Sequence, residues 1–235
     1  MTLPVNTAPT YFLEIPSVKK KIKFRPFLVK EKKLLMIALQ DRKSEDVILE
    51  AVRQIVLNCT YNQVEIDDLT MYDLEFIFLN LYMKSKDNKQ ELTFRCENEI
   101  KPGEICGHLN TVTLNLDDVF INKESVNNKI MLTDTLGVIL KYPKFSDIKY
   151  SKTNNIYEKL PYYLDSIFDG EDVIDEYTEA ELTEFIDTLT DEQFSKIEEF
   201  IDSEPKLHAK LKIKCSKCGH EEEVILEGLQ SFLGF

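Results

Sequence analysis

The sequence predicts an α+β fold in which a helical bundle and an N-terminal β-hairpin are joined to a split β unit that carries cysteines. Three patterns support this prediction. Apolar residues recur at helical spacing between residues 30 and 86, they alternate with polar residues between 91 and 118, and two cysteine-bearing loops share one layout. The chain of 235 residues is 43% hydrophobic and 30% charged, which is ordinary for a globular protein.

The first 90 residues predict a hairpin followed by three helices. Prolines exclude a helix from residues 1–18, and the apolar residues between them favour an extended arm or strand. Residues 19–28 alternate loosely and are expected to form the second strand of the hairpin. Helical spacing of apolar residues then predicts helices over residues 31–40, 44–58 and 70–84.

The middle of the chain predicts strands, then a helix. Residues 91–118 are expected to form strands around a cysteine-bearing loop. Residues 129–141 predict a second hairpin, with turn-forming residues at 133–137. A helix is expected from about Phe145 to Ile167.

Two capping boxes predict two short helices in the last third of the chain. Thr178 pairs with Glu181, Thr190 pairs with Gln193, and each pair precedes an amphipathic segment. The chain is expected to continue in strands over residues 207–214 and 223–226.

Both ends of the chain carry apolar residues that need burial. The arm contains Tyr11 and Phe12, and the tail contains Leu229, Phe232, Leu233 and Phe235. We expect Tyr11, Phe12 and the segment Phe232–Phe235 to be covered by neighbouring protein chains.

The formal net charge of −13 is concentrated in one segment. Residues 165–204 contain sixteen acidic residues and one basic residue, whereas residues 19–33 contain eight basic residues and one acidic residue. Segments of opposite charge can dock a neighbouring surface, and two solvated helix faces would produce the same pattern. The acidic balance makes nucleic acid an unexpected partner.

The chain is expected to fold in a reducing cytoplasm. It has no apolar run long enough for membrane insertion, and its N-terminus lacks the features of a secretory signal. Cysteines in that compartment bind metal or lie in cores. Cys59 lies in an apolar helical segment and is predicted to be a buried thiol.

The other four cysteines form two loops with the same layout: strand, cysteine, loop, Cys-Gly-His, strand. The glycine allows a positive φ, so that backbone N–H groups can approach the sulfurs. Zn²⁺ binds four thiolates in a tetrahedron. We therefore predict a split zinc-ribbon-like β unit, in which the two loops hold one structural Zn²⁺ through Cys96, Cys106, Cys215 and Cys218.

Alternatives remain open for these residues. They could be four cytosolic thiols without a metal, and His108 or His220 could replace one cysteine, although both are expected at the rim. A redox Cys-x-x-Cys motif is disfavoured because a strand-like segment follows Cys218. A catalytic zinc is disfavoured because four cysteines leave no open position.

No other catalytic motif is found in the sequence. It has no glycine-rich phosphate loop, no nucleophile elbow and no His-Glu-x-x-His. The segment Asp169–Asp172 lacks the ligand spacing of an EF-hand. The expected protein is therefore not an enzyme.

The predicted organisation has four parts. Residues 1–90 form the arm, hairpin and helical bundle, and residues 91–118 form the first half of the zinc-ribbon-like unit. Residues 119–206 form an inserted hairpin and an acidic helical segment. Residues 207–235 form the second half of the zinc-ribbon-like unit and the apolar tail.

A set of motifs is distributed over both ends and the centre of the chain. They are Lys23–Leu35, Thr93–Cys96 with Cys106-Gly107, Gln193–Phe200, Pro205–Leu207, Cys215–Gly219, and Leu226–Leu229 with Phe232. Their order resembles that of the baseplate hub proteins of T4-like tailed phages.

The resemblance implies a non-enzymatic structural or assembly component of a contractile-tail baseplate. This component would be either a hub subunit of the virion or an assembly chaperone absent from the finished virion. The implied partners are other baseplate and tail proteins, with a homo-oligomer inside a symmetric assembly as a further arrangement. The resemblance also implies that the protein is expressed late in infection, is assembled in the host cytoplasm and is finally located in the tail baseplate of the virion.

Two other functions stay open at this point. A zinc-ribbon regulator that binds nucleic acid would use the basic residues 19–33, but few basic or aromatic side chains flank the cysteines. A metalloenzyme would need a ligand other than cysteine at an open zinc position.

Overall fold

The computed structural model describes residues 7–40, 45–86, 88–122, 127–148 and 155–233, and it confirms the α+β class. The chain divides into two compact units. Unit 1 comprises Met1–Glu65, Tyr72–Asn122 and Lys206–Phe235, and unit 2 comprises Ile66–Met71 and Lys123–Pro205. No helix in the described ranges is long and apolar enough to cross a membrane.

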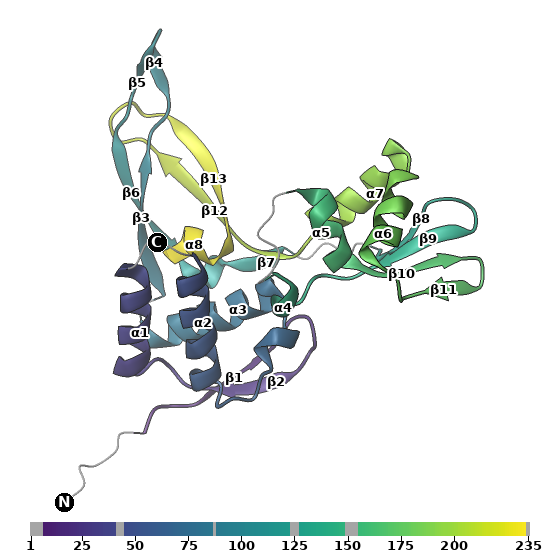
Figure 1. The fold of residues 1–235 in the computed structure, drawn as a ribbon. Helices are drawn as coiled ribbons and strands as arrows, with labels where there is room; N and C mark the ends of the chain where they lie inside the picture. Colours follow the sequence, from purple (N-terminus) through teal and green to yellow (C-terminus); the bar gives the residue numbers. More distant parts are fainter. Residues whose placement is uncertain (1–6, 41–44, 87, 123–126, 149–154, 234–235) are drawn as a thin grey trace, which may run out of the picture. The chain divides into compact units, whose positions relative to one another are not determined.

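The hairpin and three helices of unit 1 form as predicted (Figure 1). β1 (Tyr11–Glu14) pairs antiparallel with β2 (Lys21–Phe24). The helices that follow are α1 (Val29–Gln40), α2 (Glu45–Cys59) and α3 (Met71–Ser85). The predicted start of the second helix, Ser44, lies outside the described residues.

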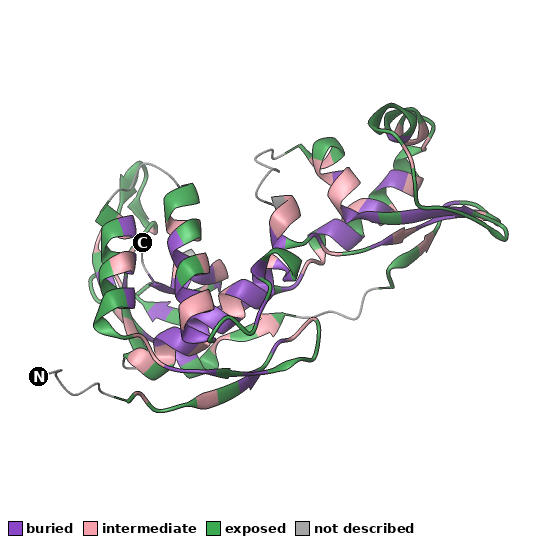
Figure 2. Ribbon diagram, turned by 60° about the horizontal axis from the view of Figure 1, so that its bottom comes forward, coloured by how far each residue is buried: buried purple, intermediate pink, exposed green. Residues whose placement is uncertain are grey.

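α3 supplies the largest share of the helical core of unit 1. Eight of its fifteen residues are buried, and Ile77, Phe78 and Leu81 are fully inaccessible (Figure 2). The buried carboxylate of Asp73 accepts hydrogen bonds from Ser17, one from the backbone N–H at 3.0 Å and one from the hydroxyl. The turn of the hairpin is thereby tied to the first turn of α3.

The strands of unit 1 are all paired antiparallel. β3 (Lys89–Arg95) pairs with β6 (Leu109–Asn115), and β4 (Glu99–Lys101) pairs with β5 (Glu104–Ile105). β12 (Lys206–Lys214) lies between β13 (Glu221–Glu227) and β7 (Phe120–Asn122), the latter being a strand that the sequence analysis did not predict. The short 3-10 helix η2 (Leu116–Asp118) separates β6 from β7.

The apolar tail is covered by its own chain. α8 (Gly228–Leu233) leaves Leu229, Phe232 and Leu233 with exposed fractions of only 6%, 0% and 5%. The Leu229 N–H donates to the Glu75 carboxylate of α3 at 3.1 Å. The prediction that neighbouring chains cover the tail is therefore wrong for Phe232 and Leu233, because the tail folds back as a short helix. Phe235 lies outside the described residues, and at the other end Phe12 is 68% exposed.

Unit 2 contains a four-stranded antiparallel sheet in the order β11-β10-β9-β8. Its strands are β8 (Lys129–Met131), β9 (Leu136–Leu140), β10 (Leu164–Asp169) and β11 (Asp172–Ile174). Its helices are η1 (Ile66–Asp68), α4 (Phe145–Ile148), α5 (Ile156–Tyr163), α6 (Glu179–Asp187) and α7 (Asp191–Asp202). Both predicted capping boxes are present, at the starts of α6 and α7. A separate core, including Leu140, Ile197 and Phe200, joins the sheet to α5, α6 and α7.

The predicted helix from Phe145 to Ile167 is wrong at Asn155, an extended residue that caps the separate helix α5, and in its last turn. α5 ends at Tyr163, and residues 164–169 form β10 instead. Ile167 and Phe168 pair with Val138 and Gly137 of β9 and are 7% and 5% exposed. Pairing with an available strand edge outweighs the weak local preference for helix. Residues 149–154 of the predicted helix lie outside the described residues.

Gly137 belongs to a strand and not to the predicted turn. A Cβ at this position would collide with the Phe168 ring and lie 2.5 Å from the Ile130 carbonyl oxygen. The glycine is thus needed because two neighbouring strands approach closely and one of them places an aromatic ring over the backbone.

Candidate metal centre

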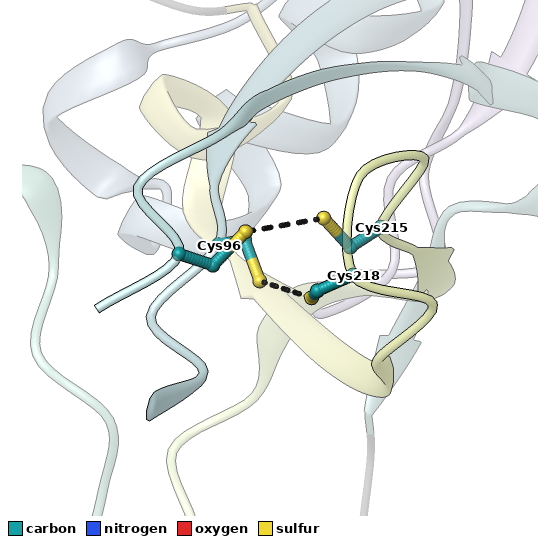
Figure 3. A group of neighbouring side chains, drawn as sticks. Cys96, Cys215 and Cys218 are labelled. Atoms are coloured by element: carbon teal, nitrogen blue, oxygen red, sulfur yellow. Dashed lines mark hydrogen bonds between the residues drawn. The ribbon is translucent and has the colours of Figure 1, made fainter. Parts of the chain in front are cut away.

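Four cysteines from two distant parts of the sequence come together in unit 1. Cys96 directly follows β3 and Cys106 follows β5, whereas Cys215 directly follows β12 and Cys218 lies in the turn before β13. Their sulfur atoms all lie within 4.8 Å of one another, although Cys106 and Cys215 are 109 residues apart in sequence. Figure 3 shows Cys96, Cys215 and Cys218 pointing toward one another.

The sulfur spacing matches a tetrahedral metal shell. The sulfurs of Cys96 and Cys218 are 3.7 Å apart, and those of Cys106 and Cys215 are 3.8 Å apart. A tetrahedron with Zn–S bonds of about 2.3 Å has sulfur–sulfur edges of about 3.8 Å. A disulfide would bring two sulfurs to about 2.0 Å, and all four cysteines are free. The group could therefore hold one metal ion.

The two loops repeat the same pair of backbone hydrogen bonds. The Cys96 N–H donates to the His108 carbonyl at 2.8 Å, and the Gly107 N–H donates to the Cys96 carbonyl at 3.0 Å. In the second loop, the Cys215 N–H donates to the His220 carbonyl at 2.8 Å, and the Gly219 N–H donates to the Cys215 carbonyl at 2.9 Å. The layout that the sequence repeats is thus also repeated in three dimensions.

The glycines make this repeated turn possible. Gly107 and Gly219 have φ values of 62° and 77°, in the left-handed region that favours glycine. A Cβ at Gly107 would make only an ordinary contact with the Arg95 guanidinium, at 3.5 Å, so the positive φ is what requires glycine there.

The first loop differs from the second by an inserted hairpin. β4 and β5 lie between Cys96 and Cys106, and the Cys106 N–H donates to the Asn98 carbonyl at 2.8 Å, which closes the base of the insertion. The two cysteines of this loop therefore stay close although nine residues separate them. Figure 1 shows β4 and β5 extending beyond the ends of β3 and β6.

The four thiols cannot all ionise without a cation. The Cys218 N–H, with help from the Lys217 N–H and the Asn110 side chain, lowers the pKa of Cys215 to about 5 against the opposing effect of burial. The Asn98 N–H lowers the pKa of Cys96, but burial and the three neighbouring thiols together raise it to about 12. Similarly, the pKa of Cys106 is raised, since burial and two neighbouring sulfurs outweigh the His108 N–H. A divalent cation would compensate the charge of the remaining thiolates.

Polar contacts around the sulfurs join the two loops to each other. The Asn98 side chain lies 3.8 Å from the Cys218 sulfur. The Ser216 N–H donates to the Asn110 side-chain oxygen at 3.0 Å, and the Ser216 hydroxyl lies 2.8 Å from Nε2 of His108. Lys217 donates to the Cys106 carbonyl at 3.3 Å. Such surrounding contacts orient the ligands of metal sites.

The chemistry that this donor set supports is structural. Four thiolates fill the tetrahedron, and no open position remains for a substrate or an activated water. Three of the four cysteines are buried, and Cys218 is half-buried. Neither His108 nor His220 is among the residues whose ligand atoms converge in the described part of the chain.

The basic residues of the cysteine-bearing strands are balanced by acidic ones. Lys214 pairs with Glu221 at 2.7 Å, and Lys212 lies opposite Glu223 in the β12–β13 register. This arrangement does not favour a surface for nucleic acid, which needs uncompensated positive charge.

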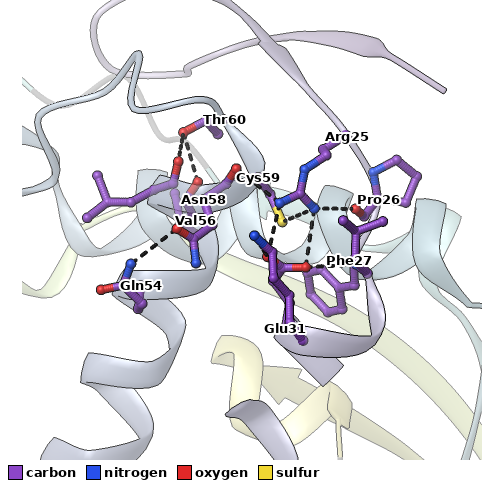
Figure 4. Close-up of polar contacts among 12 residues, drawn as sticks. Arg25, Pro26, Phe27, Glu31, Gln54, Val56, Asn58, Cys59 and Thr60 are labelled. Carbon is purple, nitrogen blue, oxygen red and sulfur yellow. Dashed lines mark hydrogen bonds and ion pairs between the residues drawn. The ribbon is translucent and has the colours of Figure 1, made fainter. Parts of the chain in front are cut away.

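Cys59 is the buried thiol that the sequence predicts, with an exposed fraction of 0%. Burial raises its pKa to about 12, in spite of the nearby Arg25 guanidinium. The sequence analysis missed the ion pair beside it. Arg25 contacts the Glu31 carboxylate at 3.0 and 3.2 Å and the Cys59 sulfur at 3.6 Å (Figure 4). The only available signal was one acidic residue within a basic segment.

Comparison with known proteins gives one family. A family model described as "T4 bacteriophage base plate protein" matches residues 8–234. No curated protein and no solved structure matches the chain.

Proposed function

The chain belongs to the family of T4 bacteriophage base plate proteins, and from this premise we propose that it is a non-enzymatic component of the baseplate hub. Within this proposal, a structural Zn²⁺ bound by Cys96, Cys106, Cys215 and Cys218 stabilises the protein. The family match, which extends over residues 8–234, carries the assignment to the baseplate. It implies the phage tail as the location and other tail proteins as partners.

The zinc proposal is supported by the convergence of the sulfurs. A closed Cys₄ shell supplies folding free energy and no reactivity. The two halves of the site come from segments separated by residues Lys123–Pro205 of unit 2 and by β6, β7 and β12. Binding of Zn²⁺ therefore holds together the two ends of the long segment between the cysteine pairs. Such a cross-link suits a baseplate protein that has to keep its structure under mechanical force.

The partner proposal is supported by exposed apolar side chains on projecting elements. Phe12 on β1 is 68% exposed, and Ile100 and Ile105 near the β4–β5 hairpin are 39% and 50% exposed. Apolar residues on such projections mark contact surfaces. We propose that neighbouring tail proteins cover these side chains.

Elemental analysis of the purified chain tests the zinc site. We expect one zinc per chain, and we expect Cys215→Ser to lose the metal and to unfold unit 1 because ligand loss removes binding free energy. Cys59→Ala is the matched control, since it removes a buried cysteine outside the sulfur group and should keep the zinc. A wild-type chain that binds no zinc when it is produced in zinc-supplemented medium would contradict the proposal.

Proteomic analysis of purified virions tests the hub proposal and separates its two forms. A hub subunit is expected in finished particles at a fixed ratio to the other baseplate proteins. An assembly chaperone is expected in infected cells but not in particles, and loss of the gene should then give tails without complete baseplates. Complete tails formed without the chain would contradict both forms.

A further inference from the structure

The two units differ sharply in charge. Unit 1 contains 21 basic and 20 acidic residues and is close to neutral, whereas unit 2 contains 8 basic and 22 acidic residues. Two copies of unit 2 therefore repel each other. If unit 2 of one copy contacts a second copy, the second copy has to present a basic surface to it.

Helix α1 in unit 1 presents such a basic surface together with apolar side chains. Val29, Lys33, Met36 and Ile37 are spaced by four, three and one residues, which places them on one side of the helix. Val29, Met36 and Ile37 have exposed fractions of 69%, 51% and 64%. Buried Glu31, Leu35 and Ala38 mark the opposite side, which packs on the core.

No ion pair among the described residues neutralises the two lysines of this surface. Lys32 and Lys33 are exposed and form no ion pair with any described residue, and the only acidic residue of α1, Glu31, is buried against Arg25. α1 thus exposes apolar groups beside uncompensated lysines. Isolated exposed apolar residues are common, but three of them on one helical face suggest a covered surface.

The hairpin β10–β11 in unit 2 carries the complementary surface. Val173 and Ile174 of β11 are 62% and 48% exposed, and every residue of β11 is exposed. Glu171, Asp172, Asp175 and Glu176 lie beside them in the chain, are exposed and form no ion pair within the described ranges. β11 is also the edge strand of its sheet.

We propose that α1 of one copy of this chain docks on the β10–β11 hairpin of a second copy. The lysines of α1 face the carboxylates around β11, and the exposed apolar side chains of both surfaces are buried in the contact. The contact joins two different surfaces of the chain, so each copy can use both of its surfaces at once. Two copies that exchange both contacts form a closed dimer, and copies that do not close in this way form a larger ring or a filament.

This inference names a second copy of the chain as a partner, in addition to the tail proteins of the proposed function. It does not depend on the zinc site. A chain that stays monomeric would overturn the self-contact but leave the baseplate proposal standing, because zinc content and presence in virions are measured separately.

Sedimentation velocity on the full chain tests the contact. Wild type is expected to associate as protein concentration rises, and more strongly at low salt because salt screens exposed charges. Lys32→Glu with Lys33→Glu, and separately Asp172→Lys with Glu176→Lys, should each weaken association by roughly tenfold or more. When the two variants are mixed, opposite charges face each other again, and association should return.

The matched control is Lys19→Glu with Lys21→Glu, which makes the same change in net charge on the β1–β2 hairpin and should associate like wild type. Circular dichroism and zinc content confirm that each variant is folded. Ile37→Asp provides a second variant at an exposed position of α1. Wild type that remains monomeric, variants that associate unchanged, or a mixture that does not recover would each overturn the proposal.

Discussion

Arg25 and Glu31 form an ion pair whose side chains are only 10% and 0% exposed. The carboxylate of Glu31 accepts hydrogen bonds from both terminal nitrogens of Arg25 and from the Leu28 N–H at 2.8 Å. These bonds replace the hydrogen bonds that water would make to an exposed carboxylate. Arg25 also donates to the carbonyl of Asn58 at 3.3 Å at the end of α2. A single buried cluster therefore connects the segment after β2 with two helices.

Removing one partner of this pair should be costly because it leaves the other charge buried and uncompensated. Glu31→Gln is expected to lower the free energy of unfolding by about 3–5 kcal/mol. Lys33→Gln, at an exposed side chain of the same helix that forms no ion pair with any described residue, should change it by less than about 0.5 kcal/mol. Urea denaturation of the zinc-loaded proteins measures the free energy of unfolding of both variants. Equal changes in the two variants would show that the buried ion pair stabilises the protein no more than an exposed side chain does.

The same pair gives a defined pH dependence. Burial raises the pKa of Glu31, but hydrogen bonds from Arg25 and the Leu28 N–H outweigh it, so that the pKa of the folded state lies below the ordinary value. A depressed carboxyl pKa stabilises the protein above the unfolded value of about 4.3, and this stabilisation is lost as the pH falls through the folded value. Glu31→Gln should remove this part of the acid sensitivity.

At the scale of elements, the β4–β5 hairpin is an insertion into an otherwise complete turn. Both loops make the same two backbone hydrogen bonds, and the second loop does so with only Ser216 and Lys217 between its cysteines. The hairpin residues 97–105 should therefore be dispensable for the metal site.

Replacing residues 97–105 by Ser-Lys tests this equivalence. The shortened chain is expected to bind one zinc and to unfold at nearly the same temperature as wild type, because all four sulfurs and the flanking glycines remain. Calorimetry and elemental analysis measure both quantities. Loss of zinc would show that the Asn98 contacts at the base of the hairpin are needed to position Cys96 and Cys106.

Capping boxes, prolines and the alternation of apolar residues predict the helices and strands whose formation depends on neighbouring residues in the sequence. The helices α6 and α7 begin at the capping boxes seen in the sequence, and the hairpin β1–β2 follows from prolines and alternation. β10 was missed because residues 164–169 read as the end of a helix and only pairing with β9 makes them a strand. Gly137 was read as a turn residue because the ring of Phe168, which requires it, is distant in sequence.

The sulfur cluster was predictable because the sequence repeats one layout in both halves: strand, cysteine, loop, Cys-Gly-His, strand. The Arg25–Glu31 pair was not predictable, since an exposed and a buried glutamate look alike in a lysine-rich segment. The course of the tail was missed because an apolar end can be covered by its own chain or by a partner, and composition does not distinguish the two.

For the whole molecule, the metal site and the unit structure predict two independent unfolding events. The proposed Zn²⁺ would join residues that are 109 positions apart, and closing a loop of about 100 residues is worth about 4–5 kcal/mol in the chain-entropy description. Unit 2 has its own core of helices and sheet. A strong chelator should therefore lower the unfolding temperature of unit 1 and leave that of unit 2 nearly unchanged.

Calorimetry with and without the chelator checks this prediction, with Cys59→Ala as a variant that should respond like wild type. Two transitions are expected, of which only one shifts. A single transition that moves as a whole would mean that the units unfold cooperatively and that the metal stabilises both of them.

The separation of the two cysteine pairs also has a consequence for the growing polypeptide. Cys96 and Cys106 are synthesised first, and Cys215 follows 109 residues after Cys106. At about 5–20 residues per second, the early pair waits on the order of 5–20 seconds for the late pair. A chain whose synthesis stops before Cys215 cannot assemble the four sulfurs, so the proposed metal site can close only after synthesis has passed Cys218.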